Sequence, residues 1–411
     1  MTTSVTFADV AAAHRQIAGA VAATPCIGSP ALSRRAGAEI VLKLENLQRT
    51  GSFKARGALV KLSSLTPEQR TRGVVAMSAG NHAQGVAYHA ERLGIPATIV
   101  MPTFTPLTKV EGTRRYGAAV VLHGESFEEA SARAHELEEA QGLVFVHPYD
   151  DPAIVAGQGT VALEMLEAFP ALDVLVVPIG GGGLIAGMAI AARHLKPEIE
   201  IIGVEAALYP SVFRVLRRLP PDFGGPTVAE GIAVKSPGAI TLPVIEELVA
   251  DILLVGEDEI ETAMLRLMES EKQVTEGAGA AALAAVLAHR ERFSGRKVGV
   301  VVSGGNVDLR LLSSITLRGL VREGRLARLR IAITDQPGVL AKVTHLIGES
   351  GGNIVEVHHG RAFTRLSAKA AELEVILEAR GPEHVREIVN RLRAMSYPVE
   401  LLTPSDPMTV A

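Results

Sequence analysis

The chain contains 411 residues, of which 47% are hydrophobic and 21% are charged, and its formal net charge is −4. This size accommodates two or three domains with large cores, and the lack of a long basic run argues against nucleic acid as a partner. The apolar stretches are too short, or too rich in glycine and alanine, to span a bilayer, and no signal-peptide pattern is evident. We therefore expect a cytoplasmic protein with no membrane partner. The one cysteine, Cys26, excludes an intrachain disulfide and a cysteine-rich zinc site, and we interpret it as a small packed residue.

Strand-like apolar runs alternate with alanine-rich amphipathic stretches from residue 37 to about residue 320. The apolar runs are continuous rather than alternating, which is typical of parallel strands covered on both faces in an α/β protein. The predicted strands are 39–44, 74–77, 97–101, 119–123, 143–146, 174–179, 200–204 and 297–302. Predicted helices between them include 81–93, 106–116, 126–141, 157–169 and 184–195.

The sequence changes character near residues 318–325, which are polar and basic. We expect a first domain at 1–320, a linker at 321–326, a second domain at 327–403 and a frayed tail at 404–411. The second domain has the element order β-α-β-β-α-β of a ferredoxin-like unit. Its predicted strands are 327–333, 353–359, 368–379 and 399–402, and its predicted helices are 338–349 and 382–395.

A lysine lies in a turn of small residues shortly after the predicted strand 39–44. Residues 50–57 read TGSFKARG, with Lys54 between Phe53 and Ala55. Lysine is normally a solvated surface charge, because burying an ammonium group is costly. An amine whose pKa is lowered can form a Schiff base with an aldehyde. The segment therefore indicates either covalent catalysis or an ordinary solvated loop lysine.

Four consecutive glycines, Gly180 to Gly183, follow the predicted strand 174–179 and precede a helical run from Leu184. Glycine lets the backbone approach a ligand closely, and the N–H groups of a helix N-terminus favour a phosphate. A tight turn alone would need only one or two glycines, so the four favour an anion site.

The same segment also matches a looser dinucleotide fingerprint, Gly181-x-Gly183-x-x-Ala186, with Glu205 at the spacing of a ribose-binding carboxylate. By this pattern alone a nicotinamide-dependent dehydrogenase stays open, although that interpretation gives Lys54 no role.

Two further turns follow predicted strands. Residues 78–85 read SAGNHAQG, where Ser78 and a helix N-terminus could hold a carboxylate and Asn81 could donate to an oxyanion, or where the turn could simply cap the helix. Residues 303–306 read SGGN, where Ser303 is either a ligand-facing hydroxyl or a satisfied strand-end serine. The histidines are scattered without ligand spacing, so no metal site is predicted.

Taken together and in this order, the motifs resemble those of the tryptophan-synthase-β-like (fold type II) pyridoxal-phosphate enzymes, and within them the threonine ammonia-lyases (threonine dehydratases). The resemblance covers roughly residues 5 to 320 and rests on 44–58, 78–85, 180–184 and 303–306. It implies two open twisted parallel-sheet subdomains, the smaller one at roughly 48–146 inserted in the larger one. Residues 334–340 and 352–354 resemble an ACT regulatory domain, which commonly pairs and binds amino-acid effectors.

The resemblance also implies roles for single residues. Lys54 would bind pyridoxal 5'-phosphate covalently and then act as the base on the substrate Cα–H. Phe53 would pack against the cofactor ring, Asn81 would bind its phenolic oxygen, and Ser303 would face its nitrogen. The phosphate would lie on Gly180, Gly181, Gly182, Gly183 and Leu184, and the substrate carboxylate on Ser78, Asn81 and His82. An effector would contact Asp335, Pro337, Gly338, Val339, Leu340 and Asn353.

The implied chemistry is elimination of water from L-threonine, and from L-serine as a second substrate. A serine opposite the ring nitrogen makes the cofactor a weaker electron sink than a carboxylate would, which suits elimination. Related serine racemases place a second serine just before Gly80, whereas this chain has Ala79, so elimination should dominate over racemisation. Those racemases also bind a divalent ion after the strand that ends here at Glu205, but residues 206–211 contain no second carboxylate.

Alternatives remain within and outside this family. A serine racemase, a serine dehydratase or a hydroxyaspartate dehydratase would share the same motifs. The C-terminal domain could be a plain dimerisation module, or the whole chain a non-catalytic amino-acid sensor. In each case we expect a homo-oligomer, either a dimer or a tetramer, with isoleucine or valine as the obvious effectors if the domain is regulatory.

Overall fold

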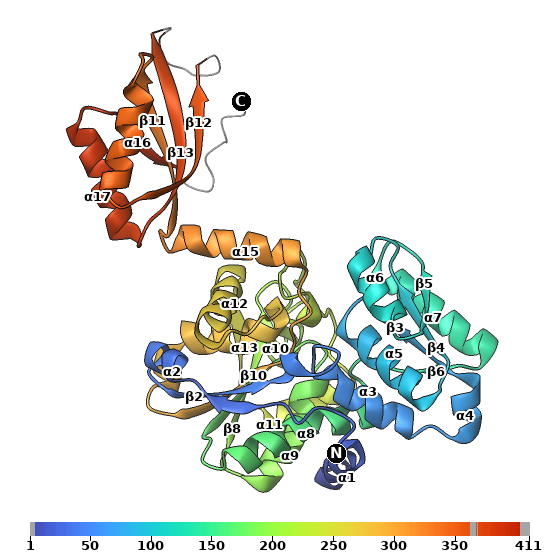
Figure 1. The fold of residues 1–411 in the computed structure, drawn as a ribbon. Coiled ribbons are helices and arrows are strands. Elements are labelled where there is room, and N and C mark those ends of the chain that lie inside the picture. The colour runs from blue at the N-terminus through green and yellow to red at the C-terminus, as the bar shows by residue number, and fades with distance from the viewer. Residues whose placement is uncertain (1–4, 362–366, 368, 403–411) are drawn as a thin grey trace. The chain divides into compact units, whose positions relative to one another are not determined.

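The computed structural model describes residues 5–361, 367 and 369–402. It divides into two compact units, Met1–Asp308 and Leu309–Ala411, which are described separately (Figure 1). The first unit holds two largely parallel sheets with helices around them, and the second holds one antiparallel sheet with two helices packed on it. The predicted α/β class with a separate C-terminal sheet domain is confirmed.

The larger sheet has six strands in the order β1-β2-β10-β7-β8-β9, and all neighbours are parallel except β1 and β2. Its strands are β1 (Cys26–Gly28), β2 (Glu39–Leu44), β7 (Val174–Pro178), β8 (Glu200–Ala206), β9 (Asp251–Val255) and β10 (Lys297–Val302). The central strands are buried along almost their whole length, which explains their continuous apolar runs. Of the two edge strands, β1 has only three residues and β9 is only partly buried, so the pattern did not reveal them.

Helices cover both faces of this sheet, with α8 and α9 on one side and α12 and α13 on the other (Figure 1). The helices of this part are α1 (Phe7–Ile17), α2 (Pro30–Ala36), α3 (Lys54–Ser63), α8 (Pro152–Ala168), α9 (Gly183–Leu195), α10 (Ser211–Leu216), α11 (Thr241–Leu248), α12 (Glu257–Glu271), α13 (Gly277–Ala288) and α14 (Arg290–Phe293), with 3-10 turns η1 (Glu45–Leu47) and η2 (Glu230–Ile232).

The smaller sheet is inserted in the chain between β2 and β7 and has the fully parallel order β5-β4-β3-β6. Its strands are β3 (Val74–Met77), β4 (Ala97–Met101), β5 (Ala119–Leu122) and β6 (Val144–Phe145), and its helices are α4 (Pro67–Arg72), α5 (Asn81–Leu93), α6 (Leu107–Arg114) and α7 (Phe127–Gln141). The chain therefore crosses from the larger sheet to the smaller one once after β2 and returns once after β6.

Close glycine contacts pack α3 and α9 against α8. A Cβ atom on Gly157 would lie 2.6 Å from the Cα of Gly57, and one on Gly187 would lie 2.1 Å from a backbone oxygen of α8. Only hydrogen atoms fit between these helices, so α3 is held against α8 at a fixed distance. The predicted start of α8 at residue 157 is wrong, because Asp151 caps the helix and Pro152 opens it.

The second unit consists of α15 (Leu309–Arg322), β11 (Leu326–Thr334), α16 (Val339–Glu349), β12 (Asn353–Gly360), β13 (Ala370–Glu378), α17 (Pro382–Ala394) and β14 (Val399–Leu402). The strands form an antiparallel sheet in the order β12-β13-β11-β14, with α16 and α17 in contact with each other over its core. The observed division at 308/309 comes before the expected boundary at 320, because residues 309–322 form one continuous helix that contacts β11. Residue 368 and the expected tail 404–411 lie outside the described residues.

Across the described ranges, every helix is too short or too polar to pass through a lipid bilayer.

Candidate active site

Lys54 is the first residue of α3, and its half-buried side chain is directed towards the segment that follows β6. Its Nζ donates a hydrogen bond to Pro148 O at 2.6 Å and lies 5.2 Å from the centre of the Phe53 ring. Burial lowers the pKa of the Lys54 amine to about 8, while the nearby Glu276 carboxylate opposes this shift. An amine with a lowered pKa in a small-residue turn is suited to nucleophilic attack on a carbonyl group.

The segment after β6 joins Lys54 to the glycine turn, Gly180 to Gly183. Tyr149, the neighbour of Pro148, covers this turn so closely that a Cβ atom on Gly181 would lie 2.2 Å from its ring. A Cβ atom on Gly183 would lie 2.8 Å from the Tyr149 carbonyl oxygen. Both glycines are therefore required for the observed packing, and the turn lies next to the residues that hold the Lys54 amine.

The glycine turn connects β7 to α9 and presents backbone donors. Gly182 has a φ of +95°, which favours glycine. The carbonyl of Gly181 is fixed by Thr241 Oγ1 at 2.7 Å and by Gly238 N at 3.2 Å. In the described part of the chain, the N–H groups of residues 180–184 donate to no backbone or side-chain acceptor. Free N–H groups at a helix N-terminus are the donors that a phosphate requires.

Asn81 is the first residue of α5, and its amide is held on both sides. Its Oδ1 accepts a hydrogen bond from Asn306 Nδ2 at 2.7 Å, and its Nδ2 donates to Glu276 Oε1 at 2.6 Å. Asn306 Nδ2 also donates to Thr50 O at 2.7 Å. The TGSFK, SAGN and SGGN segments therefore meet at one amide.

Ser303 ends β10 beside this cluster. It is 2% exposed, its carbonyl accepts a hydrogen bond from Phe53 N at 3.1 Å, and its Oγ donates to Ala278 O at 3.3 Å. The Ser303 backbone is therefore paired with the lysine turn, and its hydroxyl is bonded to the first turn of α13. Ser52 Oγ and Thr275 Oγ1, which are also buried, have no partner among the described residues.

Ser78 and His82 flank the start of α5. Ser78 Oγ accepts a hydrogen bond from Gly80 N at 3.2 Å. His82 Nε2 lies 2.8 Å from Val146 O, and because a carbonyl only accepts, this nitrogen carries the hydrogen. Burial, with a further contribution from the Lys54 charge, lowers the pKa of His82 to about 3, so the ring is neutral and Nδ1 is an acceptor.

A buried ion cluster lies behind the lysine turn. Arg56, which is fully buried, donates to Glu45 Oε1 at 2.8 Å and to Glu164 Oε1 at 2.6 Å. Lys43 Nζ completes the cluster, with Glu164 Oε2 at 2.5 Å and Thr24 O at 2.7 Å. Arg56 stands two residues after Lys54, so the cluster fixes the first turn of α3.

Glu205 does not have the surroundings of a ribose-binding carboxylate. It is fully buried, and its two oxygens accept hydrogen bonds from Val212 N and Phe213 N, both at 2.8 Å, at the start of α10. Burial raises the pKa of Glu205 to about 7. Its acceptor capacity is used inside the fold, which argues against the dinucleotide interpretation. Within the described ranges, no group of three or more His, Cys, Asp or Glu residues could hold a metal ion.

The expected effector residues do not converge within one chain. Asp335 to Gly338 form the turn between β11 and α16, Val339 and Leu340 begin α16, and Asp335 Oδ2 accepts a hydrogen bond from Arg361 Nε at 2.9 Å. Asn353 lies beyond the far end of α16, about 16 Å away along 11 helical residues, and its Nδ2 donates to Glu378 Oε2 at 2.9 Å. A single ligand can therefore contact both places only if two chains contribute.

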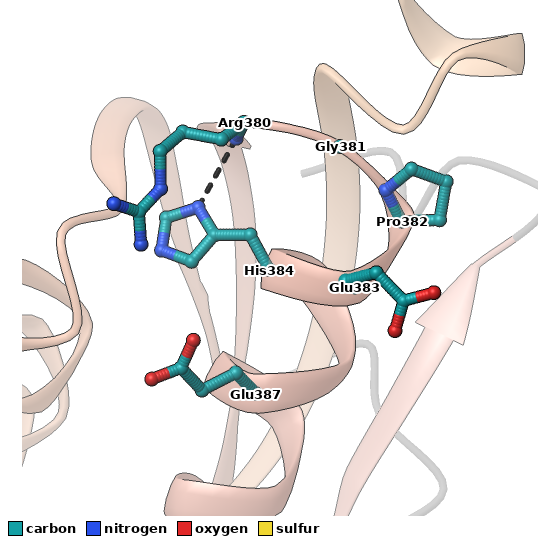
Figure 2. Close-up of a pocket in the computed structure, with 6 residues that line it drawn as sticks. All are labelled: Arg380, Gly381, Pro382, Glu383, His384 and Glu387. Carbon is teal, nitrogen blue, oxygen red and sulfur yellow. Dashed lines mark hydrogen bonds between the residues drawn. The ribbon is translucent and has the colours of Figure 1, made fainter.

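The second unit also has a pocket of about 380 Å³ at the start of α17, lined by Arg380, Gly381, Pro382, Glu383, His384 and Glu387 (Figure 2). Figure 2 shows the His384 ring accepting a hydrogen bond from the Arg380 backbone N–H at 3.1 Å. His384 Nε2 lies 2.7 Å from Ser350 O, so both ring nitrogens are used within the fold. None of the expected effector residues lines this pocket.

Three residues around the site had no role in the sequence analysis. Asn306 ends the SGGN segment, in which only Ser303 was given a role. Glu276 immediately precedes α13, a helix built only of glycine, alanine, leucine and valine, and an acidic residue at the start of such a buried helix could have been noticed. Tyr149 is an aromatic residue in a polar turn after β6, which is a weaker signal.

The fold and the site together define an α/β protein in which a glycine turn with free N–H groups lies beside a lysine amine of lowered pKa. A family model described as pyridoxal-phosphate dependent enzyme matches residues 17–304, and one described as ACT domain matches residues 327–394. The chain belongs to the pyridoxal-phosphate-dependent enzymes, and pyridoxal 5'-phosphate is its cofactor. The predicted fold type and the predicted C-terminal ACT domain are confirmed.

Among curated proteins, the L-threonine ammonia-lyase of Thermotoga maritima is 44% identical over 400 residues, which cover 97% of this chain and 100% of that protein. Among solved structures, the processed form of threonine deaminase isoform 2 from Solanum lycopersicum is 34% identical with a TM-score of 0.71, covering 77% of this chain and 90% of that one. Serine racemase from Dictyostelium discoideum is 35% identical with a TM-score of 0.70, covering 74% of this chain and 99% of that one.

Proposed function

We propose that the protein is a threonine ammonia-lyase, which converts L-threonine to 2-oxobutanoate and ammonia and L-serine to pyruvate and ammonia. The observation that carries this proposal is the Lys54 amine, which has a lowered pKa and contacts Pro148 beside the glycine turn. The residue before it, Phe53, is bonded to Ser303. The names of the relative and of one structural neighbour, threonine ammonia-lyase and threonine deaminase, support the same substrate.

The residues around the site fit the cofactor. The free N–H groups of residues 180–184 would bind its phosphate, and Phe53 would lie against its ring. Asn81 would donate its remaining Nδ2 hydrogen to the phenolic oxygen, and the Ser303 hydroxyl would face the ring nitrogen. When bound, the cofactor supplies an electron sink that makes the α-hydrogen of an amino acid acidic.

Lys54 would remove that α-hydrogen, since its amine has a pKa of about 8 and can accept a proton near neutral pH. The substrate carboxylate would lie on the Ser78 hydroxyl and on the backbone N–H groups at the start of α5. The neutral His82 ring would line this pocket as an acceptor rather than donate to the carboxylate, because its one hydrogen goes to Val146 O.

Elimination would dominate over racemisation because no hydroxyl stands at Ala79. A racemase needs an acid on the face opposite Lys54 to return a proton to Cα, and the alanine methyl cannot supply one. The similarity to a serine racemase keeps this alternative worth testing. The nicotinamide-dependent alternative is wrong, because the matched family is pyridoxal-phosphate dependent and Glu205 is engaged by α10.

The test is a set of initial rates on L-threonine, L-serine and D-serine, with the 2-oxo acid and the chirality of the remaining serine both measured. We expect 2-oxobutanoate from L-threonine, pyruvate from L-serine, no formation of D-serine, and no product with Lys54→Ala. Racemised serine without oxo acid would refute the proposal. A protein that binds effectors but turns over none of these substrates would instead be a sensor.

We further propose that the ACT domain binds an amino-acid effector at the turn 335–340, and that isoleucine or valine alters the rate on threonine. The direction of that effect would distinguish isoleucine biosynthesis from threonine catabolism. Since Asn353 lies at the other end of α16, its involvement would require a second chain, in keeping with a homodimer or homotetramer. The effector proposal is tested by measuring the rate on threonine with each effector in the wild type and in Asp335→Ala. Light scattering tests the oligomeric state. We also propose that the enzyme is cytoplasmic.

A further inference from the structure

We propose that Asn306 and Glu276 are positioning residues that fix the direction of the Asn81 amide, so that it presents N–H rather than C=O to the cofactor. This inference rests on the proposed function, in which Asn81 donates to the phenolic oxygen. It assigns a role to the last residue of the SGGN segment and to a carboxylate outside the recognised motifs.

The direction of an asparagine amide is set by its partners, because its oxygen and nitrogen have nearly the same size. Here the partners form one chain of hydrogen bonds, Thr50 O to Asn306 to Asn81 to Glu276, with distances of 2.7, 2.7 and 2.6 Å. Both ends of this chain are acceptors: Thr50 contributes a backbone carbonyl and Glu276 a carboxylate.

The acceptor at the first end determines every later step. Because Thr50 O only accepts, the Asn306 atom beside it is Nδ2, and this NH₂ group has one hydrogen left for Asn81. The Asn81 atom that faces Asn306 must therefore be the oxygen, and the atom that faces Glu276 must be the nitrogen. Asn81 Nδ2 uses one hydrogen on Glu276 and keeps the second for a ligand.

The backbone holds Asn306 in place. Gly305 N donates to Gly51 O at 2.8 Å, and Ser52 and Gly304 form an isolated β-bridge, so the SGGN segment is paired with the lysine turn. Gly51 has a φ of +74°, and a Cβ atom there would lie 2.5 Å from Asn306 Oδ1. The glycine of the lysine turn is therefore needed to admit the Asn306 side chain.

Glu276 is held from its own side. Its backbone N–H donates to Gly304 O at 3.1 Å, and a Cβ atom on Gly304 would lie 2.3 Å from Glu276 Oε1. The charged groups that act on this carboxylate are Lys54 on α3, Lys109 on α6 and Glu230 on η2. A neutral glutamine could accept the same hydrogen bond through its amide oxygen, so the positioning role needs an acceptor and not a charge.

The experiment compares three variants of the full chain in a titration of apoenzyme with pyridoxal 5'-phosphate, measured by absorbance without substrate. Asn306→Asp is nearly isosteric but presents an acceptor to Asn81, which favours the reversed amide. It should weaken cofactor binding about tenfold or more, as expected for a buried hydrogen bond replaced by two facing acceptors. Glu276→Gln should stay within about threefold of wild type, whereas Glu276→Ala should lose affinity.

The matched control is Asn46→Asp, which also replaces a half-buried asparagine beside Gly305 by a carboxylate. Asn46 donates to Gln273 Oε1 and not to Asn81, so this variant should leave the Asn81 amide unchanged. If Asn306→Asp does not fold, Asn306→Ala replaces it and should bind the cofactor more weakly than Asn46→Asp. Cofactor affinity of the Asn306 variants equal to that of Asn46→Asp would overturn the inference, as would a loss in Glu276→Gln as large as in Glu276→Ala. A wild type that binds the cofactor but forms no 2-oxobutanoate would refute the proposed function alone, and the affinity order would still decide the positioning role.

Discussion

The state of the Lys54 amine can be tested through the rate at which the apoenzyme captures pyridoxal 5'-phosphate at different pH values. With a pKa of about 8, about one amine in eleven is unprotonated at pH 7. With the ordinary value of 10.5, only about one in three thousand would be. Burial therefore makes the nucleophilic form about 300 times more abundant at pH 7, and the capture rate should rise with pH to a plateau with its midpoint near pH 8.

The perturbation is Glu276→Gln, which removes the negative charge that opposes the shift. Burial raises the pKa of Glu276 to about 7, so at pH 8 the wild-type carboxylate is mostly ionised and stabilises the Lys54 ammonium. Its removal should move the midpoint to lower pH, measured by stopped-flow absorbance across pH 6 to 10. A wild-type midpoint above pH 10, or a midpoint that rises in Glu276→Gln, would refute the view that burial and this carboxylate control the amine.

Three further predictions concern stability and cofactor binding. Gly181→Ala should weaken cofactor binding about tenfold, because its Cβ would lie 2.2 Å from the Tyr149 ring. The control Gly348→Ala, whose Cβ would have no atom within 4 Å, should leave cofactor affinity unchanged. Equal affinities of the two variants would contradict the close packing at the glycine turn. Arg56→Met should lower the free energy of unfolding of the apoenzyme, measured in urea, by about 3–5 kcal/mol, since the Glu45 carboxylate would stay buried without the Arg56 guanidinium. The control is Lys297→Met, which removes a more exposed ion pair with Glu39. A loss in Arg56→Met no larger than in this control would show that the buried cluster is dispensable. Lys54→Met should abolish activity yet stabilise the apoenzyme at pH 7 by up to about 3 kcal/mol, because the amine has a lower pKa in the folded than in the unfolded chain. The wild type regains this stability as the pH rises from about 8 to 10.5, so the difference between variant and wild type should shrink over that range. Urea unfolding at pH 7 and at about pH 10.5 that gives the same difference in free energy would count against the burial of a charge at position 54.

The fold could be predicted well where strands are buried on both faces. All eight strands expected between residues 39 and 302 occur. A continuous run of branched apolar residues favours a strand that is buried on both faces of a parallel sheet. The start of α8 was misplaced by five residues, and the helix contains glycines at 157 and 159 near the predicted start. These glycines are contact points between helices, and contacts of that kind depend on which helices the fold brings together.

The candidate site was predicted only as far as local motifs reach. Lys54, Asn81, the glycine turn and Ser303 each follow a strand, and the structure brings those strand ends together. Glu276 and Tyr149 carry weaker local signals, because their importance comes from partners that are remote in the sequence. Only the folded arrangement shows which atoms such residues contact.

The smaller sheet is attached to the rest of its unit by two chain segments, and this has a mechanical consequence. Side chains also join it to the larger part, through the ion pairs of Lys109 on α6 with Glu230 and of Glu128 on α7 with Lys235. Lys54 follows the first crossing and Pro148 the second, and their hydrogen bond spans the gap between the two. Any rotation of the smaller sheet would therefore have to break these surface ion pairs, whereas the Lys54–Pro148 hydrogen bond beside the two crossings could stay in place.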